Sequence, residues 1–409
     1  MLLSHSKLAF NSTIRYWWRH LIQSSIISRK LTSATGSGTI GLLDEIPINP
    51  EYSTYKRYNA SQLTNRTTPP KCVQMLVRDF IDDSLYNPNY GQVWHTSTEL
   101  FKPWYGYAIA KYVVTEYKLS GSPSHDLIIY ELGAGNATLM RNVLDYIQKF
   151  EPSIYKRTRY KIVEISSKLA ERQLQNQSIQ NNKNIHDCVE IINKSIFDWD
   201  ELVADLRYDC ISEKPYQAVV IIDDKGDFEE IYEPVTDPLI MRYLALRSRT
   251  LYKTPVLQNR FFRQLRNKLP FSPNMTSPEF IPTKELLFLE ILKDYFPQHR
   301  LIISDFYKLP DTIRGIDAPV VQTRYEDTMV PCSTYMVSPG WFDIFFPTNF
   351  ELLRDIYRLV CHSGTAEENI RILSQRDFLK RYADLDRTKT KSGENPMLMY
   401  YENVKFLLS

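Results

Sequence analysis

The sequence contains few cysteines, and their spacing excludes two kinds of site. Its five cysteines are scattered over 409 residues without a Cys-x-x-Cys pair, so neither a zinc ribbon nor a disulfide framework is supported. The seven histidines are equally dispersed, and the neighbours Cys361 and His362 have no second pair that would complete a metal site. We therefore expect reduced, mostly buried cysteines and no bound metal.

Long stretches of one charge sign or of apolar residues are also missing. The 50 basic and 48 acidic residues are interspersed and give a net charge of +2, so nucleic acid is not the leading partner. The N-terminal apolar stretch is interrupted by Arg15, Arg19 and His20 and is shorter than the roughly 20 residues that span a bilayer. We expect no transmembrane helix. With 43% hydrophobic residues, the chain can form a large core in one elaborated domain or in two.

Acidic residues are absent before Asp44. Among the serines, threonines and apolar residues of this segment lie Lys7, Arg15, Arg19, Arg29 and Lys30. This composition is typical of an organelle presequence, and we interpret residues 1–48 as a mitochondrial presequence and linker, which implies a matrix location. A disordered or DNA-binding basic tail is the alternative. Such tails seldom carry an apolar face like the one formed by Trp17, Trp18, Leu21, Ile22, Ile26 and Ile27.

From residue 127 the hydrophobic pattern alternates between strands and helices. Strands are expected over LIIYELG (127–133), RYKIVEIS (159–166) and CVEIINKSIFDWD (188–200). Helices are expected over ATLMRNVLDYIQKF (137–150), with Leu139, Val143, Ile147 and Phe150 on one face, and over SKLAERQLQNQ (167–177). This order implies right-handed crossovers and a parallel sheet. The expected fold class is a doubly wound, Rossmann-like α/β sheet with helical and β-hairpin insertions.

Further elements are expected on both sides of this sheet. Helices are predicted over 71–83, from Ser97 onward with a Thr96–Glu99 capping box, over 241–252 and over 283–296. A hairpin with its turn at Asp224–Gly226 is predicted over 216–234, and a strand over 299–306. The segment 340–360 is predicted to be a strand followed by a helix that Thr348 or Asn349 caps.

The turn after the first strand has the character of a ligand-binding loop. Glycines at 133 and 135 let the backbone approach a ligand, and the N–H groups of the following helix face outward. The third glycine of a dinucleotide fingerprint is replaced by Ala137, and Glu131 would repel a pyrophosphate. Because Glu131 suits a cation, S-adenosyl-L-methionine is the better candidate. An ordinary turn between a strand and a helix is the alternative.

Two further acids follow the next strands. Glu164 lies at the end of the second strand, where an acid can bind ribose hydroxyls. Asp198 follows the third strand and could accept from the adenine amino group, with Phe197 or Trp199 beside the ring. Three strand-end acids in this order favour the cofactor interpretation.

Five segments carry a resemblance to a known family. They are STELFKPWYGYAIAKYV, YELGAGNATLM, YKIVEIS, PVVQTRYEDTMVPCSTYMV and GWFDIFFPTNFELL. From about residue 70 to 360 the chain resembles the MidA (midasin) family of S-adenosyl-L-methionine-dependent methyltransferases, in its fungal mitochondrial branch. The resemblance implies a seven-stranded methyltransferase domain. It also implies methyl transfer to an arginine of a protein substrate, a core subunit of respiratory complex I, in support of the assembly of that complex.

The resemblance also assigns residues and regions. Glu131, Gly133, Gly135 and Asn136 would line the methionine end of S-adenosyl-L-methionine, Glu164 its ribose, and Phe197 with Asp198 its adenine. A helical N-terminal region is expected over 49–126, the methyltransferase-like domain over 127–360 and a C-terminal extension over 361–409.

One departure from the family pattern concerns the fourth strand. Family members have an acid-tipped fourth strand that faces the methyl group, whereas this chain passes from Trp199 to Pro215 without one. YQAVVII (216–222) resembles the later hairpin, which implies that the fourth strand is lost. Without the family, the same residues would be that strand, with Asp223 and Asp224 as its acids. Both interpretations are kept at this point.

The sequence also contains a candidate for the catalytic group. A carboxylate must orient and deprotonate the acceptor, and Glu99 is the candidate, with a helix-capping role as its alternative. Asp305 lies at a strand end, where a cap or turn role is equally compatible. The aromatics Trp104, Tyr105, Trp341 and Phe342 could wall a pocket or pack in the core. A catalytically impaired assembly or interaction factor is therefore the second hypothesis, and methylation of ribosomal RNA is disfavoured by the balanced charge.

Overall fold

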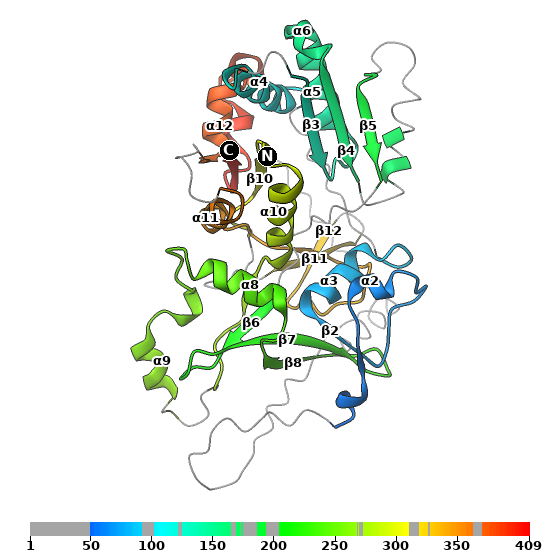
Figure 1. Ribbon diagram of the computed structural model, residues 1–409, viewed down its shortest axis with the longest axis vertical. Coiled ribbons are helices and arrows are strands. Elements are labelled where there is room, and N and C mark those ends of the chain that lie inside the picture. Colours follow the sequence, from blue (N-terminus) through cyan, green and yellow to red (C-terminus); the bar gives the residue numbers. More distant parts are fainter. Residues whose placement is uncertain are drawn as a thin grey trace, which may run out of the picture.

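The structure of the chain is a computed structural model (Figure 1). It describes residues 50–91, 102–121, 125–164, 169–171, 173–174, 186–193, 204–267, 269, 273–310, 319–325, 328–362 and 370–409. Of the helices in this part of the chain, none is long and apolar enough to cross a membrane.

A parallel sheet forms the upper end of the molecule in Figure 1. Its strands, in spatial order, are β3 (Leu127–Leu132), β4 (Thr158–Val163) and β5 (Val189–Ile192). Leu132 is opposite Val163, and Val163 is opposite Ile192, so all three strands end at the same edge of the sheet. The structure confirms the α/β class and places the three predicted strands in parallel. It ends the third one at Ile192, earlier than expected.

Helices α4 (Trp104–Leu119), α5 (Thr138–Phe150) and the short α6 (Pro152–Tyr155) accompany this sheet. On α5 the buried residues are Met140, Val143, Leu144 and Ile147, a stripe with the 3.6-residue period of an amphipathic helix. The expected face was partly wrong, because Phe150 is 51% exposed. The opposite face of the sheet is less covered, with Ile128 51% and Tyr130 42% exposed on β3.

A second, antiparallel sheet lies beside the first. It has the order β10 (Ile302–Phe306), β15 (Val404–Leu408) and β14 (Arg371–Ser374). Nearby helices are α10 (Thr283–Tyr295), α11 (Phe350–Cys361), α12 (Gln375–Tyr382) and α13 (Pro396–Met399), with the 3₁₀ turn η4 (Leu385–Thr388). The last forty residues thus build part of the fold. No strand in the described ranges pairs with the free edge of β3 or of β10.

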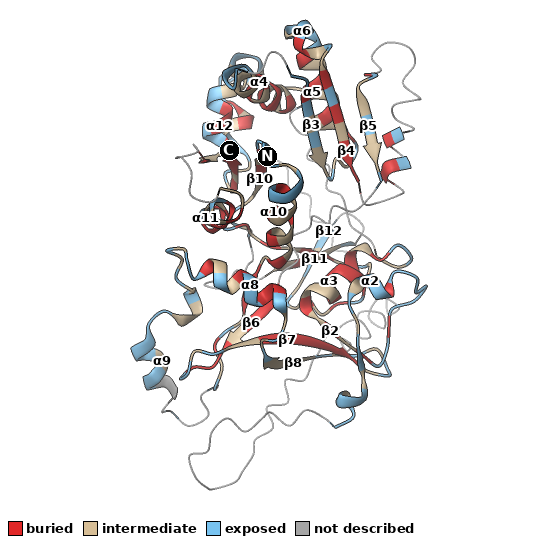
Figure 2. Ribbon diagram, in the orientation of Figure 1, coloured by how far each residue is buried: buried red, intermediate tan, exposed pale blue. Residues whose placement is uncertain are grey.

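The lower end of the molecule is a mostly antiparallel sheet. Its order is β1 (Lys56–Arg57), β2 (Val73–Leu76), β7 (Pro215–Ile222), β6 (Ala204–Tyr208) and β9 (Glu279–Ile281), with β8 (Phe228–Pro234) also on β7. Figure 2 shows β7 buried along most of its length. The helices of this region are α2 (Ala60–Leu63), α3 (Val77–Tyr86), α8 (Pro238–Arg247) and α9 (Arg260–Asn267), with the 3₁₀ turns η1 (Tyr52–Thr54) and η3 (Pro255–Leu257).

The pairing of β7 decides between the two interpretations of YQAVVII. β7 runs antiparallel to β8 through a tight turn, in which the Asp223 carboxylate accepts from the backbone N–H groups of Lys225, Gly226 and Asp227. Asp223 is thus a turn residue. β7 is not the fourth strand of the parallel sheet, so that interpretation is wrong and the hairpin interpretation is confirmed.

The predicted helix over 71–83 is only partly correct. Val73–Leu76 forms β2, because its residues pair with the buried β7, and the helix begins only at Val77. Helical spacing and strand alternation both fit such a short apolar segment, so its neighbours decide. The remaining strands are β11 (Val320–Tyr325), β12 (Thr328–Cys332) and β13 (Asp343–Phe345), which form a small antiparallel sheet.

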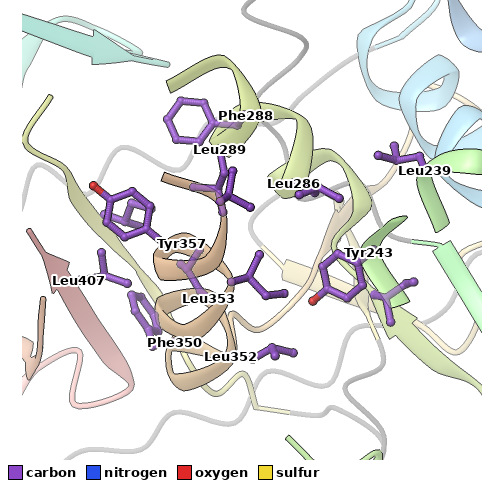
Figure 3. Close-up of a cluster of buried hydrophobic side chains, with 14 of the residues drawn as sticks. Leu239, Tyr243, Leu286, Phe288, Leu289, Phe350, Leu352, Leu353, Tyr357 and Leu407 are labelled. Carbon is purple, nitrogen blue, oxygen red and sulfur yellow. The ribbon is translucent and has the colours of Figure 1, made fainter. Parts of the chain in front are cut away.

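Three clusters of buried side chains hold these parts together. The upper cluster joins α4, α5 and β4 to β15, and includes Tyr112, Ile147, Tyr160 and Phe406. The lower cluster packs under β2 and β7, and includes Met75, Phe80 and Val220. The central cluster, drawn in Figure 3, joins α8, α10 and α11, and includes Tyr243, Leu286, Phe350, Leu353 and Tyr357. Leu132, at the end of β3, packs against the central cluster.

Candidate functional site

The loop that leaves β3 alternates between ordinary and left-handed backbone. Gly133, Gly135 and Ala137 have φ angles of +65°, +53° and +57°. The N–H of Gly133 donates to the carbonyl of Val163, which fixes the loop to the end of β4. A β-carbon added at Gly133 or Gly135 would meet no atom within 4 Å. The glycines therefore give the backbone this shape and leave open space along the loop.

Glu131 lies beneath this loop and is bonded by neutral groups. The Tyr160 hydroxyl donates to Glu131 Oε2 at 2.8 Å, and the backbone N–H of Met140, in the first turn of α5, also bonds the carboxylate. Burial raises the pKa of Glu131 to about 7, and the nearby charge of Glu164 adds to this rise. The site thus holds a carboxylate that a cation would stabilise in its ionised form.

Glu164 joins the same site through Gln173. The side-chain N–H₂ of Gln173 donates to the carbonyl of Gly135 at 2.7 Å and to Glu164 Oε2 at 3.0 Å. Asn193, directly after β5, donates to the backbone carbonyl of Glu164 at 2.8 Å. Gln173 is fully buried, and its Oε1 has no hydrogen-bond partner in the described part of the chain. The glycine loop and the ends of β4 and β5 therefore form one site.

The predicted residues of this site have different outcomes. Glu131, Gly133, Gly135 and Glu164 are brought together as described above. Asn136 is exposed in the loop, between Gly135 and the start of α5. Phe197, Asp198 and Glu99 lie outside the described residues, as does the Thr96–Glu99 capping box.

The other candidates lie elsewhere. Asp305 Oδ2 accepts from the Thr348 hydroxyl at 2.7 Å, beside Asn349, whose side chain caps α11. Trp104 and Tyr105 pack against the upper cluster and Phe342 against the lower one, whereas Trp341 is 68% exposed. These four aromatics do not wall a common pocket.

Three contributors were missed by the sequence-based prediction. Tyr160 could have been found, because strand alternation places it on the same face of β4 as Glu164. Asn193 directly follows β5, at the edge of the sheet where polar cofactor-binding groups are expected. No sequence pattern identifies Gln173, because its hydrogen bond to Gly135 depends on the path that the chain takes after β4.

The raised pKa of Glu131 predicts a pH effect on stability. The folded state holds this proton more tightly than the usual pKa of 4.5 implies, so the stability contributed by Glu131 is fully present below that pH. It is lost as the pH rises to about 7, and the loss amounts to at most about 3 kcal/mol. Glu131→Gln cannot ionise, so its free energy of unfolding should fall less than that of the wild type over this interval.

Urea unfolding at a series of pH values measures this difference. The control is Glu190→Gln, an exposed glutamate on β5 that pairs with Lys161 at 3.1 Å. The control should follow the wild-type curve, and a Glu131→Gln curve parallel to the wild type would contradict the assignment.

The chain is similar to known proteins over more than half of its length. Residues 108–366 match a family described as S-adenosyl-L-methionine-dependent methyltransferases. A curated relative from Schizosaccharomyces pombe, the mitochondrial "protein arginine methyltransferase NDUFAF7 homolog", is 23% identical over 307 residues. The match covers 68% of this chain and 64% of that protein, so the chain spans less than two thirds of the relative's length.

Two solved structures from Burkholderia thailandensis have a similar fold. One, described as a "likely methyl transferase", is bound to S-adenosyl-homocysteine, with 14% identity and a TM-score of 0.54, covering 85% of this chain and 89% of that one. The other is an uncharacterized protein of the same superfamily, with 14% identity and a TM-score of 0.53, covering 86% and 90% of the two chains.

Proposed function

This chain belongs to the family of S-adenosyl-L-methionine-dependent methyltransferases, and from that premise we propose that it methylates an arginine of a mitochondrial protein. Membership of the family confirms the resemblance in the sequence and makes S-adenosyl-L-methionine the cofactor. One observation carries the cofactor-binding part of the proposal: Glu131 and Glu164 meet at the glycine loop, and Gln173 links the loop to Glu164.

The residues present fit this cofactor. Glu131 has only neutral bonding partners, which suits the cationic amino group of the methionine end. The unpartnered Oε1 of Gln173 lies beside Glu164, so a ribose hydroxyl bound to Glu164 could also donate to it. The open space along Gly133 and Gly135 leaves room for the cofactor to approach the backbone. The cofactor, when bound, supplies an electrophilic methyl group on a sulfonium.

In this proposal each residue has a defined task. Glu131, Gly133, Gly135 and Asn136 hold the methionine end, with Glu131 ionised once a cation lies beside it. Glu164, positioned by Gln173, holds the ribose. Phe197 and Asp198 are proposed for the adenine, and Glu99 is kept as the candidate that orients the acceptor.

The acceptor and the location are also proposals. The name of the S. pombe relative supports a protein arginine as the acceptor and a mitochondrial location. The acid-free segment before Asp44 supports the same location. The resemblance of the sequence adds a complex I core subunit as the candidate substrate and the assembly of that complex as the process served.

Mass spectrometry of methylated arginines in mitochondrial proteins tests this function. At least one arginine should lose its methylation when the gene is deleted. The wild type and the exposed-site control Glu190→Gln should restore it, whereas Glu164→Gln should not. Arginine methylation that is the same with and without the gene would refute the proposal.

A second candidate function is an assembly or interaction factor that binds the cofactor without transferring its methyl group. It is favoured by the missing fourth-strand motif, since β7 belongs to the lower sheet and no described strand pairs with the edge of β3 that faces away from β4. Sequencing the transcript between Trp199 and Pro215 separates the candidates. An additional exon that encodes an acid-tipped strand would favour the enzyme, and its absence would favour the factor.

A further inference from the structure

A cavity of about 40 Å³ lies where α8, β9, α10 and the start of α11 meet. Its polar lining includes Tyr243 and Arg247 from α8, Glu279 from β9 and Glu285 from α10. Its apolar wall includes Leu352 and Leu353 of α11, and Figure 3 shows the Tyr243 hydroxyl turned toward these leucines. The cavity therefore contains several polar groups inside the central cluster.

Two of these groups satisfy each other. An Arg247 guanidinium nitrogen lies 3.0 Å from Glu279 Oε1, and another donates to the Tyr208 hydroxyl at 2.8 Å. Tyr208 in turn donates to Glu279 Oε2 at 2.6 Å. Arg247, Tyr208 and Glu279 satisfy one another's hydrogen bonds, and the charges of Arg247 and Glu279 cancel. These groups therefore position the wall of the cavity and need no ligand.

The other two groups lack such partners. Tyr243 is fully buried, and its hydroxyl forms no hydrogen bond within the described ranges. No residue of those ranges forms a hydrogen bond or an ion pair with Glu285, although Lys284 beside it pairs with Asp82 at 2.6 Å. Burial raises the pKa of Glu285 to about 8, and the charge of Asp305 adds to the rise. A buried hydroxyl without a partner is costly, which makes both groups candidates for binding a ligand.

The charges around the cavity determine what that ligand would be. Among the lining residues, the guanidinium of Arg247 is compensated by the carboxylate of Glu279, so no lining cation is left for the carboxyl group of Glu285. A positive charge is therefore missing from the cavity. The Glu285 carboxyl group and the Tyr243 hydroxyl both offer oxygen atoms that can accept hydrogen bonds. A cation with several N–H donors matches this arrangement, and a planar guanidinium can reach two acceptors at once.

We propose that this cavity is the acceptor site, in which the Glu285 carboxylate and the Tyr243 hydroxyl oxygen accept hydrogen bonds from the guanidinium of the substrate arginine. The choice of arginine rests on the proposed function. The cavity and the cofactor loop border the same central cluster, because Leu132, just before Gly133, packs against the cluster that contains Leu286 and Leu353. Glu285 and Tyr243 thus add an acceptor-binding pair that the sequence did not suggest.

Calorimetric titration of the full chain tests the site with two probes that differ in one group. N-acetyl-L-arginine amide carries the guanidinium, and N-acetyl-L-citrulline amide carries a neutral urea of nearly the same shape. The wild type should bind the arginine probe and discriminate against the citrulline probe by about tenfold or more, because a charge-assisted hydrogen bond is lost. Equal binding of the two probes, or no binding of the arginine probe, would overturn the proposal.

Isosteric variants locate the binding. Glu285→Gln should weaken binding of the arginine probe about tenfold and Tyr243→Phe severalfold. The control Glu290→Gln, on the same helix and paired with Arg242, should bind like the wild type. Binding of S-adenosyl-L-methionine serves as the check on folding. If Glu285→Gln failed to fold, Tyr243→Phe would decide, and wild-type affinity in the folded variants would place the arginine elsewhere.

Failure of this inference can be told apart from failure of the proposed function. Gene-dependent arginine methylation together with unchanged probe binding in the variants would retain the function and reject the cavity. Loss of probe binding in Glu285→Gln, without any gene-dependent arginine methylation, would retain the cavity as a guanidinium site and reject the function.

Discussion

Gly133→Val should abolish binding of S-adenosyl-L-methionine in a chain that still folds. Gly133 has a φ angle of +65°, which a β-branched residue adopts only under strain of about 1–3 kcal/mol. A β-carbon at this position would meet nothing within 4 Å, so the valine side chain would extend into the open space assigned to the cofactor. Calorimetric titration measures the loss of binding, and circular dichroism measures the remaining fold.

The matched control is Gly121→Val. Gly121 follows α4 with a φ angle of +67°, and a β-carbon there would also meet nothing within 4 Å. The control therefore carries nearly the same backbone strain away from the cofactor loop, and it should lose stability but keep its affinity. If both variants bound the cofactor equally well, the loop would not be part of its site.

Arg247→Leu should lower the free energy of unfolding by about 3–5 kcal/mol, because it leaves Glu279 as a buried charge without its partner. The side chains of Arg247 and Glu279 are each only 8% exposed, and Arg247 also donates to the Tyr208 hydroxyl. The loss of one member breaks this closed network, and the leucine cannot replace its hydrogen bonds. Urea unfolding measures the effect.

Arg242→Leu provides the comparison on the same helix. Arg242 pairs with Glu290 at 3.2 Å, but its side chain is 53% exposed, so the pair should contribute no more than about 1 kcal/mol. A similar loss in the two variants would show that burial does not decide the strength of the Arg247 pair.

Much of the cofactor end of the fold could be predicted from the sequence. The strands β3, β4 and β5 are short apolar segments. A helix connects β3 to β4, a second connection leads from β4 to β5, and this order is compatible with few topologies. Glu131 and Glu164 were identified because each lies at the carboxyl end of a parallel strand, where such ends share one edge of the sheet. The alternation along a strand also places Tyr160 on the face of Glu164.

Other features depend on contacts between distant parts of the chain. Val73–Leu76 became a strand because β7, about 150 residues later, pairs with it, and no local pattern contains that information. From its sequence alone, YQAVVII is compatible with a strand in either of two sheets. Its pairing with β8 decides between them. Tyr243 and Glu285 lie in separate helices, and only their packing around one cavity makes them a pair.

Titration of S-adenosyl-L-methionine into wild type, Glu164→Gln and Glu190→Gln tests most directly whether the acids at the strand ends form the cofactor site. Glu164→Gln retains the shape of the side chain but loses its charge, which should weaken binding about 10- to 100-fold. Glu190→Gln, at an exposed position of the same sheet, should bind like the wild type. Equal affinity in all three proteins would contradict the account.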